Sequence, residues 1–168
     1  MTGQTDEAGR LSHIDPQGRA HMVDVGDKAI TRRQATAQAV CVMSADTAQA
    51  VRTNTLRKGD VLQVARVAAI AAAKRTDELI PLCHTLPLES VDVQFHWLDE
   101  RRLQVQVTTA ATARTGVEME AMVAVSLAAL TIYDMCKSSD RELTIEQVQL
   151  LNKSGGVRGD FQRQPGSS

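Results

Sequence analysis

Two segments of this chain are predicted to be helices that are apolar around almost their whole circumference. Residues 61–74 read VLQVARVAAIAAAK, and residues 115–137 contain a mainly apolar run of 13 residues at 121–133. A helix of this kind has to be buried on most sides, within its own domain or against another subunit. Because a bilayer span takes about 20 residues, we interpret 121–133 as a buried helix and expect no membrane segment.

Alternation of apolar and polar residues predicts the strands of a sheet. Residues 91–97 and 103–107 alternate on either side of a short turn, which indicates a hairpin with one buried face. We also predict strands over residues 33–42 and 143–151. The alternation of the last strand shifts near Gln147, which suggests a bulge.

Shorter elements are indicated by local signals. Residues 20–25 read as a short strand, and Ser44 is a candidate N-cap for a helix that runs to about Arg52. Capping-box patterns precede both apolar helices, and they consist of Asp60 with Gln63 and of Thr115 with Glu118.

From its second strand onward, the chain therefore reads β-α-β-β-α-β with one extra helix. This order predicts a ferredoxin-like α+β fold, with helices packed on one face of an antiparallel sheet. We expect a flexible N-terminal arm over 1–17, a single catalytic domain over 18–158, and a flexible C-terminal tail over 159–168. Two helices that are apolar on all sides exceed what one small sheet can cover, so we also expect an oligomer.

Charge and composition exclude some classes of partner. The formal net charge is −1 and aromatic residues make up 2% of the chain, whereas nucleic-acid binders usually show a basic excess or stacking side chains. Cys41, Cys83 and Cys136 form an odd, widely spaced set, and we recognise no signal-peptide pattern in the sequence. This pattern predicts a cytoplasmic protein with free thiols.

Several basic residues could meet an anionic ligand. Lys58 and the following glycine precede a helix start, where free backbone N–H groups favour a phosphate, although a solvated lysine before an ordinary cap is the commoner arrangement. Lys74 and Arg75 end the same helix, as the helix dipole alone would favour. Lys153 begins a Lys-Ser-Gly-Gly loop that could close over a phosphate, but the chain contains no Walker motif.

A second group of candidates could transfer protons or bind a metal. Cys83 and His84 are adjacent, but one such pair lacks the second pair of a zinc site, so His84 is a candidate donor or base or a packed loop residue. Glu118 has a structural role in the predicted capping box. Glu120 has no such role, although acidic residues are favoured in any first helical turn.

Asp134 and Lys137 lie at i and i+3 on one helix face and would pair, either as an ordinary surface ion pair or as an acid/base unit. Apolar neighbours favour the second interpretation. Glu120 and Asp134 are 14 positions apart, or about 21 Å along a straight helix. If both serve one small ligand, the site must lie between subunits.

Six blocks of the sequence, in order, resemble the cyclic pyranopterin monophosphate synthase (MoaC) family of molybdenum cofactor biosynthesis. The resemblance covers about residues 11–161, and the blocks are HMVDV (21–25), KGD (58–60), AAKRT-x-x-LIPLCH (72–84), TGVEMEAM (115–122), AALTIYDMCK (128–137) and LLNKSGG (150–156). The resemblance implies a lyase that converts a cyclised dihydro-GTP, made by an upstream radical enzyme, into cyclic pyranopterin monophosphate and pyrophosphate. It also implies a hexamer, a trimer of dimers with sites at subunit interfaces.

The resemblance assigns roles to single residues. Asp134, Lys137 and Lys58 match the catalytic residues of the family. Residues that match its substrate-binding segments and basic pocket are Leu82, Cys83, His84, Met119, Glu120, Lys74, Arg75 and Lys153, with Glu118 beside them. Thr85 departs from the family, in which proline is common at this position.

These assignments give a chemical expectation. Opening a ring of the base and closing it again as a pterin needs proton transfers, so we predict that burial tunes the pKa of Lys137 downward while Asp134 orients its amine. We expect no protein-bound cofactor or metal, and Mg²⁺ could accompany the triphosphate. Two other interpretations remain: a pterin- or nucleotide-binding regulator without catalysis, and a structural oligomer with a metal at Cys83 and His84.

Overall fold

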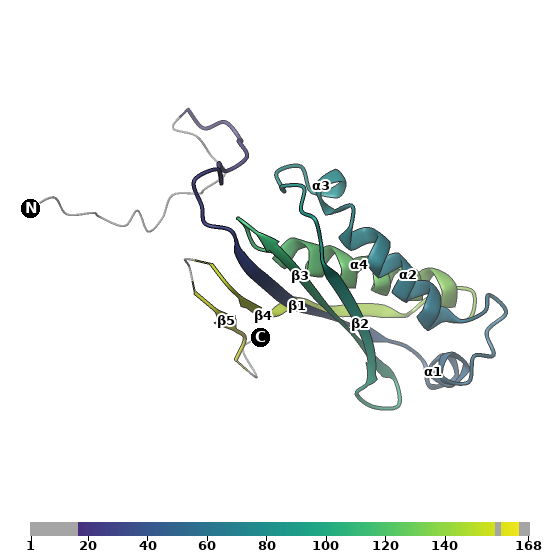
Figure 1. Cartoon of the computed structure of the whole chain (residues 1–168). Helices are drawn as coiled ribbons and strands as arrows, with labels where there is room; N and C mark the ends of the chain where they lie inside the picture. Colours follow the sequence, from purple (N-terminus) through teal and green to yellow (C-terminus); the bar gives the residue numbers. More distant parts are fainter. Residues whose placement is uncertain (1–16, 157–158, 165–168) are drawn as a thin grey trace, which may run out of the picture.

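The computed structural model describes residues 17–156 and 159–164. The predicted N-terminal arm lies outside the described residues except for Gln17, as does the end of the predicted tail. Figure 1 shows one sheet with helices beside it. In chain order the elements are β1 (Thr31–Val42), α1 (Ala45–Arg52), α2 (Val61–Ala73), α3 (Thr76–Leu79), β2 (Ser90–Trp97), β3 (Arg102–Ala113), α4 (Glu118–Cys136), β4 (Thr144–Ser154) and β5 (Phe161–Gln162).

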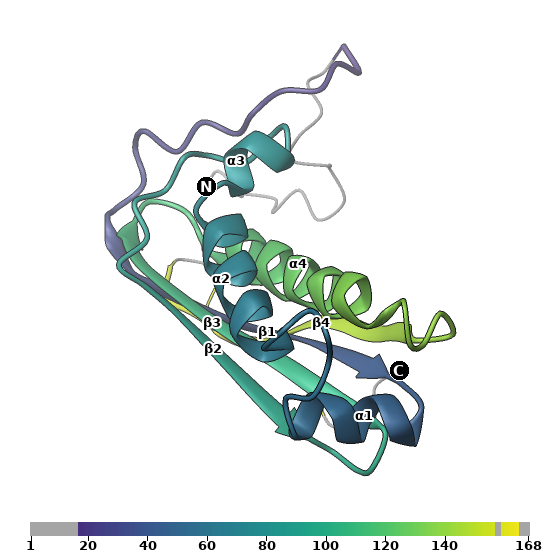
Figure 2. The same cartoon turned by 90° about the vertical axis from the view of Figure 1, so that its right-hand side faces the viewer.

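The sheet has the strand order β2-β3-β1-β4-β5, and every neighbouring pair is antiparallel. Strands β1 to β4 with helices α2 and α4 form the β-α-β-β-α-β unit, so the predicted α+β fold is confirmed. Figure 2 shows α2 and α4 side by side on one face of the sheet, with α1 near one end. The sequence analysis missed two short elements, α3 and β5, which have too few residues to show a periodic pattern.

Small side chains let the helices approach the sheet closely. The central strands β1 and β3 pair along their whole length, so that Ala39 lies opposite Val105, and both are fully buried. On α4, Ala121, Ala124 and Ala128 are also fully buried. This core contains few large side chains, as expected for a chain with 2% aromatic residues.

Local capping signals were correct for two helices and wrong for a third. Ser44 caps α1 by accepting a hydrogen bond from Thr47 N, and Asp60 caps α2 by accepting one from Gln63 N. In contrast, α4 begins at Glu118 with Val117 as its N-cap and without a side-chain cap. The predicted capping box of Thr115 and Glu118 is therefore wrong, because the Glu118 carboxylate binds Lys153 instead.

The expected strand over residues 20–25 is also absent. Only Ala20 makes a bridge, and residues 21–25 have no regular structure. The carbonyl oxygen of Val23 contacts the His84 ring rather than a neighbouring strand. The predicted bulge in β4 is confirmed: the pairing with β1 shifts register between Gln38 and Val40, and Gln147 has φ 52°.

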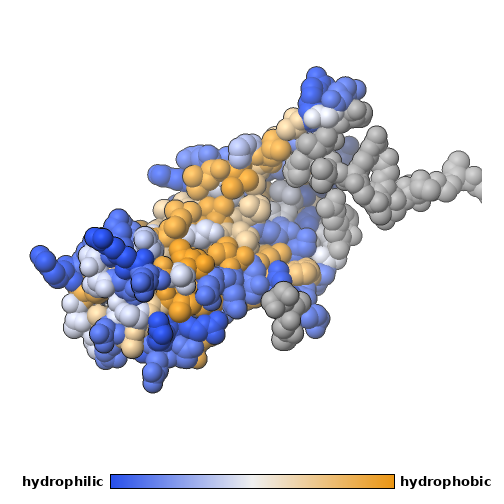
Figure 3. All heavy atoms as spheres, turned by 180° about the vertical axis from the view of Figure 1, so that it is seen from behind, coloured by the Kyte–Doolittle hydropathy of each residue, from blue (hydrophilic) through white to orange (hydrophobic). Residues whose placement is uncertain are grey.

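Helix α4 is long and apolar enough to cross a membrane by length and composition alone. In the structure it is the central core helix, since Val125, Ala129 and Ile132 are fully buried. A band of hydrophobic residues nevertheless covers part of the helical side of the molecule (Figure 3). Exposed hydrophobic residues on the helices are Val64 and Val67 on α2 and Leu130 on α4.

Candidate functional site

A pocket of about 260 Å³ lies at the N-terminal end of α4. Its walls come from the segment before β1, the loop after α3, the β3–α4 loop, the first turn of α4 and the end of β4. Seven of the predicted substrate-binding residues line it: Leu82, Cys83, His84, Glu118, Met119, Glu120 and Lys153. The structure thus brings together side chains from three separate segments of the sequence.

Glu120 is the most unusual group in this pocket. Its side chain belongs to a residue that is only 4% exposed, and its Oε2 atom is buried without a hydrogen-bond partner among the described residues. Burial raises the pKa of this carboxyl from 4.5 to about 7, and the negative charges of Glu118 and Asp77 add to the effect. Near neutral pH the carboxyl can therefore either donate or accept a proton.

Glu118 and Lys153 form an ion pair across the pocket. Lys153 Nζ donates to Glu118 Oε1 at 2.8 Å, and both side chains are partly buried. Two residues before α4, a Cβ atom on Gly116 would lie 1.8 Å from Glu118 Oε2, so a larger residue there would force the flexible Glu118 carboxylate to move. Gly116 therefore leaves the space that the Glu118 carboxylate occupies when it binds Lys153.

The loop that carries Leu82, Cys83 and His84 is fixed on both sides. The Nε2 atom of His84 lies 2.8 Å from the carbonyl oxygen of Val23, and Thr85 Oγ1 donates to Asp77 Oδ2 at 2.5 Å. Burial and nearby carboxylates raise the pKa of the Cys83 thiol. Since metals bind the thiolate, this environment disfavours a metal at Cys83, and the described residues contain no cluster of three or more potential ligands.

The three residues that match the catalytic set lie together at the other end of α4. Lys137 Nζ is 2.6 Å from Asp134 Oδ1, and Lys58 Nζ is 3.5 Å from Asp134 Oδ2. Lys58 also donates to the backbone carbonyl of Asp134 at 2.6 Å, so the loop before α2 is tied to the end of α4. One carboxylate is thus held between two ammonium groups.

The electrostatics of this cluster correct one expectation. The side chain of Lys137 is 51% exposed, and the hydrogen bond and charge of Asp134 raise its pKa. The hydrogen bond and charge of Lys137, and to a smaller extent the charge of Lys58, lower the pKa of Asp134. The prediction that burial lowers the pKa of Lys137 is therefore wrong for the single chain, because the end of α4 lies at the surface.

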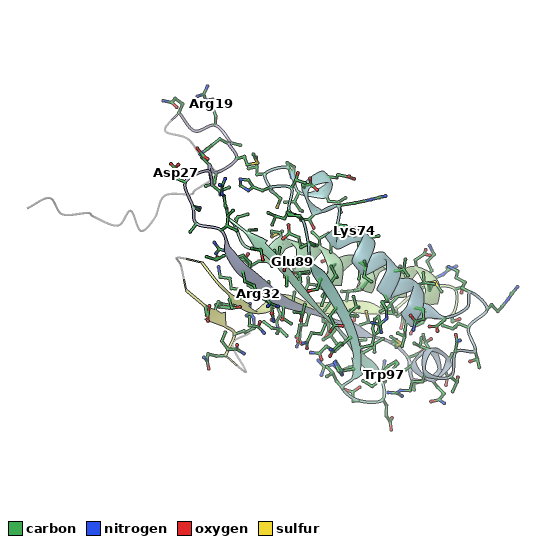
Figure 4. The ribbon with its side chains drawn as sticks, in the orientation of Figure 1. Arg19, Asp27, Arg32, Lys74, Glu89 and Trp97 are labelled. Atoms are coloured by element: carbon green, nitrogen blue, oxygen red, sulfur yellow. The ribbon has the colours of Figure 1, made fainter. Side chains whose placement is uncertain are left out.

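Lys74 and Arg75 belong to neither cluster. Lys74 is the C-cap of α2 and Arg75 precedes α3, and both are exposed. Figure 4 shows Lys74 extending outward from this helix end. Neither side chain lines the pocket.

The two clusters occupy opposite ends of one continuous helix. Glu120 lies in the first turn of α4 and Asp134 in its last turn, so about 21 Å separates them along the axis. A single copy of the chain cannot place both against one small ligand. The spacing argument made from the sequence thus applies to the folded chain.

Three basic residues of the pocket were missed by the sequence analysis: Lys28, Arg33 and Arg114. None belongs to a motif with a mechanism of its own. Arg33 is 81 residues from Arg114, and the pairing of β1 with β3 brings them together. For Arg33 and Arg114, only the strand register could have revealed this.

The sequence is similar to known proteins over nearly its whole length. The model of the MoaC family matches residues 22–156. Proteins named cyclic pyranopterin monophosphate synthase are 58% identical over 153 residues in Herpetosiphon aurantiacus and 50% identical over 167 residues in Rhodopirellula baltica. These matches cover 90% of this chain and 93% of the first relative, and 94% of this chain and 95% of the second.

Proposed function

The chain belongs to the MoaC family, and we propose that its two residue clusters together carry out the reaction for which its relatives are named. The chain is a cyclic pyranopterin monophosphate synthase, a phosphorus–oxygen lyase of molybdenum cofactor biosynthesis. Its substrate is (8S)-3',8-cyclo-7,8-dihydroguanosine 5'-triphosphate, and its products are cyclic pyranopterin monophosphate and pyrophosphate. The observation that carries the assignment of residues is the position of Asp134 between Lys58 and Lys137.

The lysine–aspartate cluster of Lys58, Asp134 and Lys137 is suited to the chemical steps. Pyrophosphate departs with negative charge on its oxygens, and two ammonium groups can stabilise that charge. Rearrangement of the base requires protons to be moved, and a lysine whose position is set by a carboxylate can donate one. Asp134 orients Lys137 through the 2.6 Å contact.

The pocket is suited to binding rather than to the whole reaction. Its volume of about 260 Å³ lies just below the ~300–1,000 Å³ of typical small-molecule sites. Its walls combine an ion pair, a buried carboxyl and further basic side chains, which can recognise a polar base and an anionic group. We propose that Leu82, Cys83, His84, Glu118, Met119, Glu120 and Lys153 hold one part of the substrate here.

We propose that a second copy of the chain completes the site. Position 127 is midway between Glu120 and Asp134, so two α4 helices packed antiparallel about a two-fold axis near Leu127 would place each pocket beside the partner's lysine–aspartate cluster. The outer face of α4 can form such a contact, because Met119 and Leu130 are 39% and 52% exposed and the small Ser126 lies between them.

Burial in this interface would also supply the desolvation of Lys137 that the single chain lacks. Removing water from Lys137 would favour its neutral amine, whereas Asp134 opposes that change. The exposed Val64 and Val67 on α2 leave apolar surface for contacts with further copies, which supports the hexamer implied by the family. In that assembly Lys74 and Arg75 of one copy can approach the triphosphate bound at another.

The remaining expectations concern cofactors and location. We propose that no resident cofactor takes part and that any Mg²⁺ is held by the triphosphate, because Mg²⁺ is commonly bound through substrate phosphates. Three free cysteines and the absence of a disulfide among the described residues support a reducing, cytoplasmic setting.

Single-turnover conversion of the cyclised substrate tests the function. Wild type and Lys137→Ala would each be mixed separately with the substrate, with the protein in excess. The release of pyrophosphate and the formation of the oxidised pterin product would be followed. We expect conversion by wild type, and binding without conversion by the variant. If wild type binds the substrate without converting it, the protein is a pterin-binding regulator instead of a lyase.

A further inference from the structure

Arg33 is a basic residue of the pocket whose guanidinium is committed to backbone carbonyls. Its Nε donates to Ala113 O at 3.4 Å, its Nη1 to Gly155 O at 3.0 Å, and its Nη2 to Arg114 O at 3.4 Å. These acceptors lie at the end of β3, in the loop after β4 and in the loop before α4. One side chain on β1 thus ties the loop after β4 to the loop before α4.

The loop after β4 is shaped to receive this side chain. Gly155 and Gly156 both have positive φ, of 91° and 92°. A Cβ atom on Gly156 would lie 1.5 Å from Arg33 Nη1, and one on Gly155 would lie 2.2 Å from the carbonyl oxygen of Arg32. Both the conformation and the space therefore require glycine at these positions.

Each loop bound by Arg33 adjoins the element that carries one member of the pocket's ion pair. Gly155 follows Lys153 by two residues, and Arg114 precedes Glu118 by four. Lys153 and Glu118 meet at 2.8 Å inside the pocket. Arg33 holds the loops that adjoin these two residues relative to each other.

We propose that Arg33 is a positioning residue for substrate binding: its fork of hydrogen bonds holds the two loops in the register that presents Lys153 and Glu118 to the substrate. We assign it a geometric role, since each of its three nitrogens already donates to a carbonyl group. This proposal depends on the proposed function only for the identity of the substrate.

Lysine at position 33 separates geometry from charge. It keeps the positive charge but cannot form three hydrogen bonds in a planar fork. For Arg33→Lys we expect KM to rise about tenfold while kcat changes less than about threefold, because the displaced binding residues weaken binding whereas the lysine–aspartate cluster, supplied by the partner copy, is unchanged. A change in melting temperature alone, without the KM effect, would mean that Arg33 is merely structural.

Arg32→Lys is the matched control. Arg32 is the neighbouring residue on β1 and points to the opposite face of the sheet, with an exposed side chain (Figure 4). It belongs to neither cluster, and we expect KM and kcat to stay at their wild-type values. Equal KM values for Arg33→Lys, Arg32→Lys and wild type would overturn the proposal.

A double-mutant cycle tests the contact itself. Gly156→Ala should raise KM as Arg33→Lys does, because the new methyl group displaces Nη1. In an Arg33→Ala background the clash with Nη1 is gone and only the strain of the positive φ remains, so Gly156→Ala should raise KM by a smaller factor than it does in wild type. Fully multiplicative effects would show that the two residues act independently and would overturn the proposal.

A binding measurement keeps this inference separate from the proposed function. Calorimetric titration with GTP, a non-reacting nucleotide triphosphate, should show the same weakening in Arg33→Lys and none in Arg32→Lys. If wild type does not convert the cyclised substrate but this pattern in GTP binding holds, the proposed function fails and the role of Arg33 stands. If conversion is intact and GTP binding is equal in all three proteins, the role of Arg33 fails.

Discussion

The raised pKa of Glu120 makes a prediction about stability that does not depend on knowing the substrate. Glu120 is 4% exposed with one carboxyl oxygen unpartnered among the described residues, and the pKa of its carboxyl is about 7 in the folded chain against 4.5 ordinarily. Between these values the folded chain holds a proton that the unfolded chain has released. The free energy of unfolding therefore falls as pH rises through this window and levels off above about pH 7.

The magnitude follows from the shift. A change in pKa from 4.5 to about 7 corresponds to roughly 3 kcal/mol at about 1.4 kcal/mol per unit. The side chain of Glu120→Gln cannot ionise, so the variant lacks this fall in the free energy of unfolding with rising pH. We expect the variant to gain about 3 kcal/mol over wild type between about pH 5 and about pH 8.

Urea denaturation followed by circular dichroism would measure this difference at each pH. The protein concentration must be constant, because the apparent stability of an oligomer depends on it. Glu78→Gln, on the exposed side of α3, is the control for a simple change of charge. A difference between Glu120→Gln and wild type that stays constant from pH 5 to pH 8 would refute the assignment of Glu120 as a buried carboxyl with a raised pKa.

Three further substitutions have expected outcomes. Lys137→Arg should abolish single-turnover conversion while GTP still binds, because arginine does not release its proton, and full activity would exclude proton transfer by Lys137. Gly116→Ala should raise KM with little effect on kcat, since its Cβ occupies the place of the Glu118 carboxylate; a wild-type KM would contradict this. Leu103→Ala should lower the free energy of unfolding by about 2–5 kcal/mol in urea titrations, because Leu103 is fully buried in β3, and a loss below about 1 kcal/mol would contradict the described core.

Local interactions explain which parts of the fold the sequence could predict. The caps of α1 and α2 depend on Ser44 and Asp60 and on backbone groups three residues away, so the sequence reveals them. The cap of α4 could not be predicted in this way, because Lys153, 35 residues away, takes the carboxylate of Glu118. The long-range ion pair of Glu118 with Lys153 thus replaced the capping box that the local sequence predicts.

The same distinction applies to the candidate site. Lys58, Asp134 and Lys137 were found because a helix end and a helix start carry them in recognisable motifs. Arg33 was missed because it contacts Gly155 across 122 residues. The burial of Lys137 was mispredicted because the apolar residues around it in sequence point into the core, while its own side chain points outward.

A mixing experiment tests most directly the claim that two copies share each site. Glu120→Ala and Lys137→Ala, each inactive alone, would be mixed under conditions that let subunits exchange, and lyase activity would be measured. If each site combines the pocket of one copy with the lysine–aspartate cluster of another, half of the sites in a mixed dimer are intact, and random mixing should restore about a quarter of wild-type activity. If both clusters of a site came from one chain, every site would keep a defect, and a mixture that stays inactive after exchange would contradict the account.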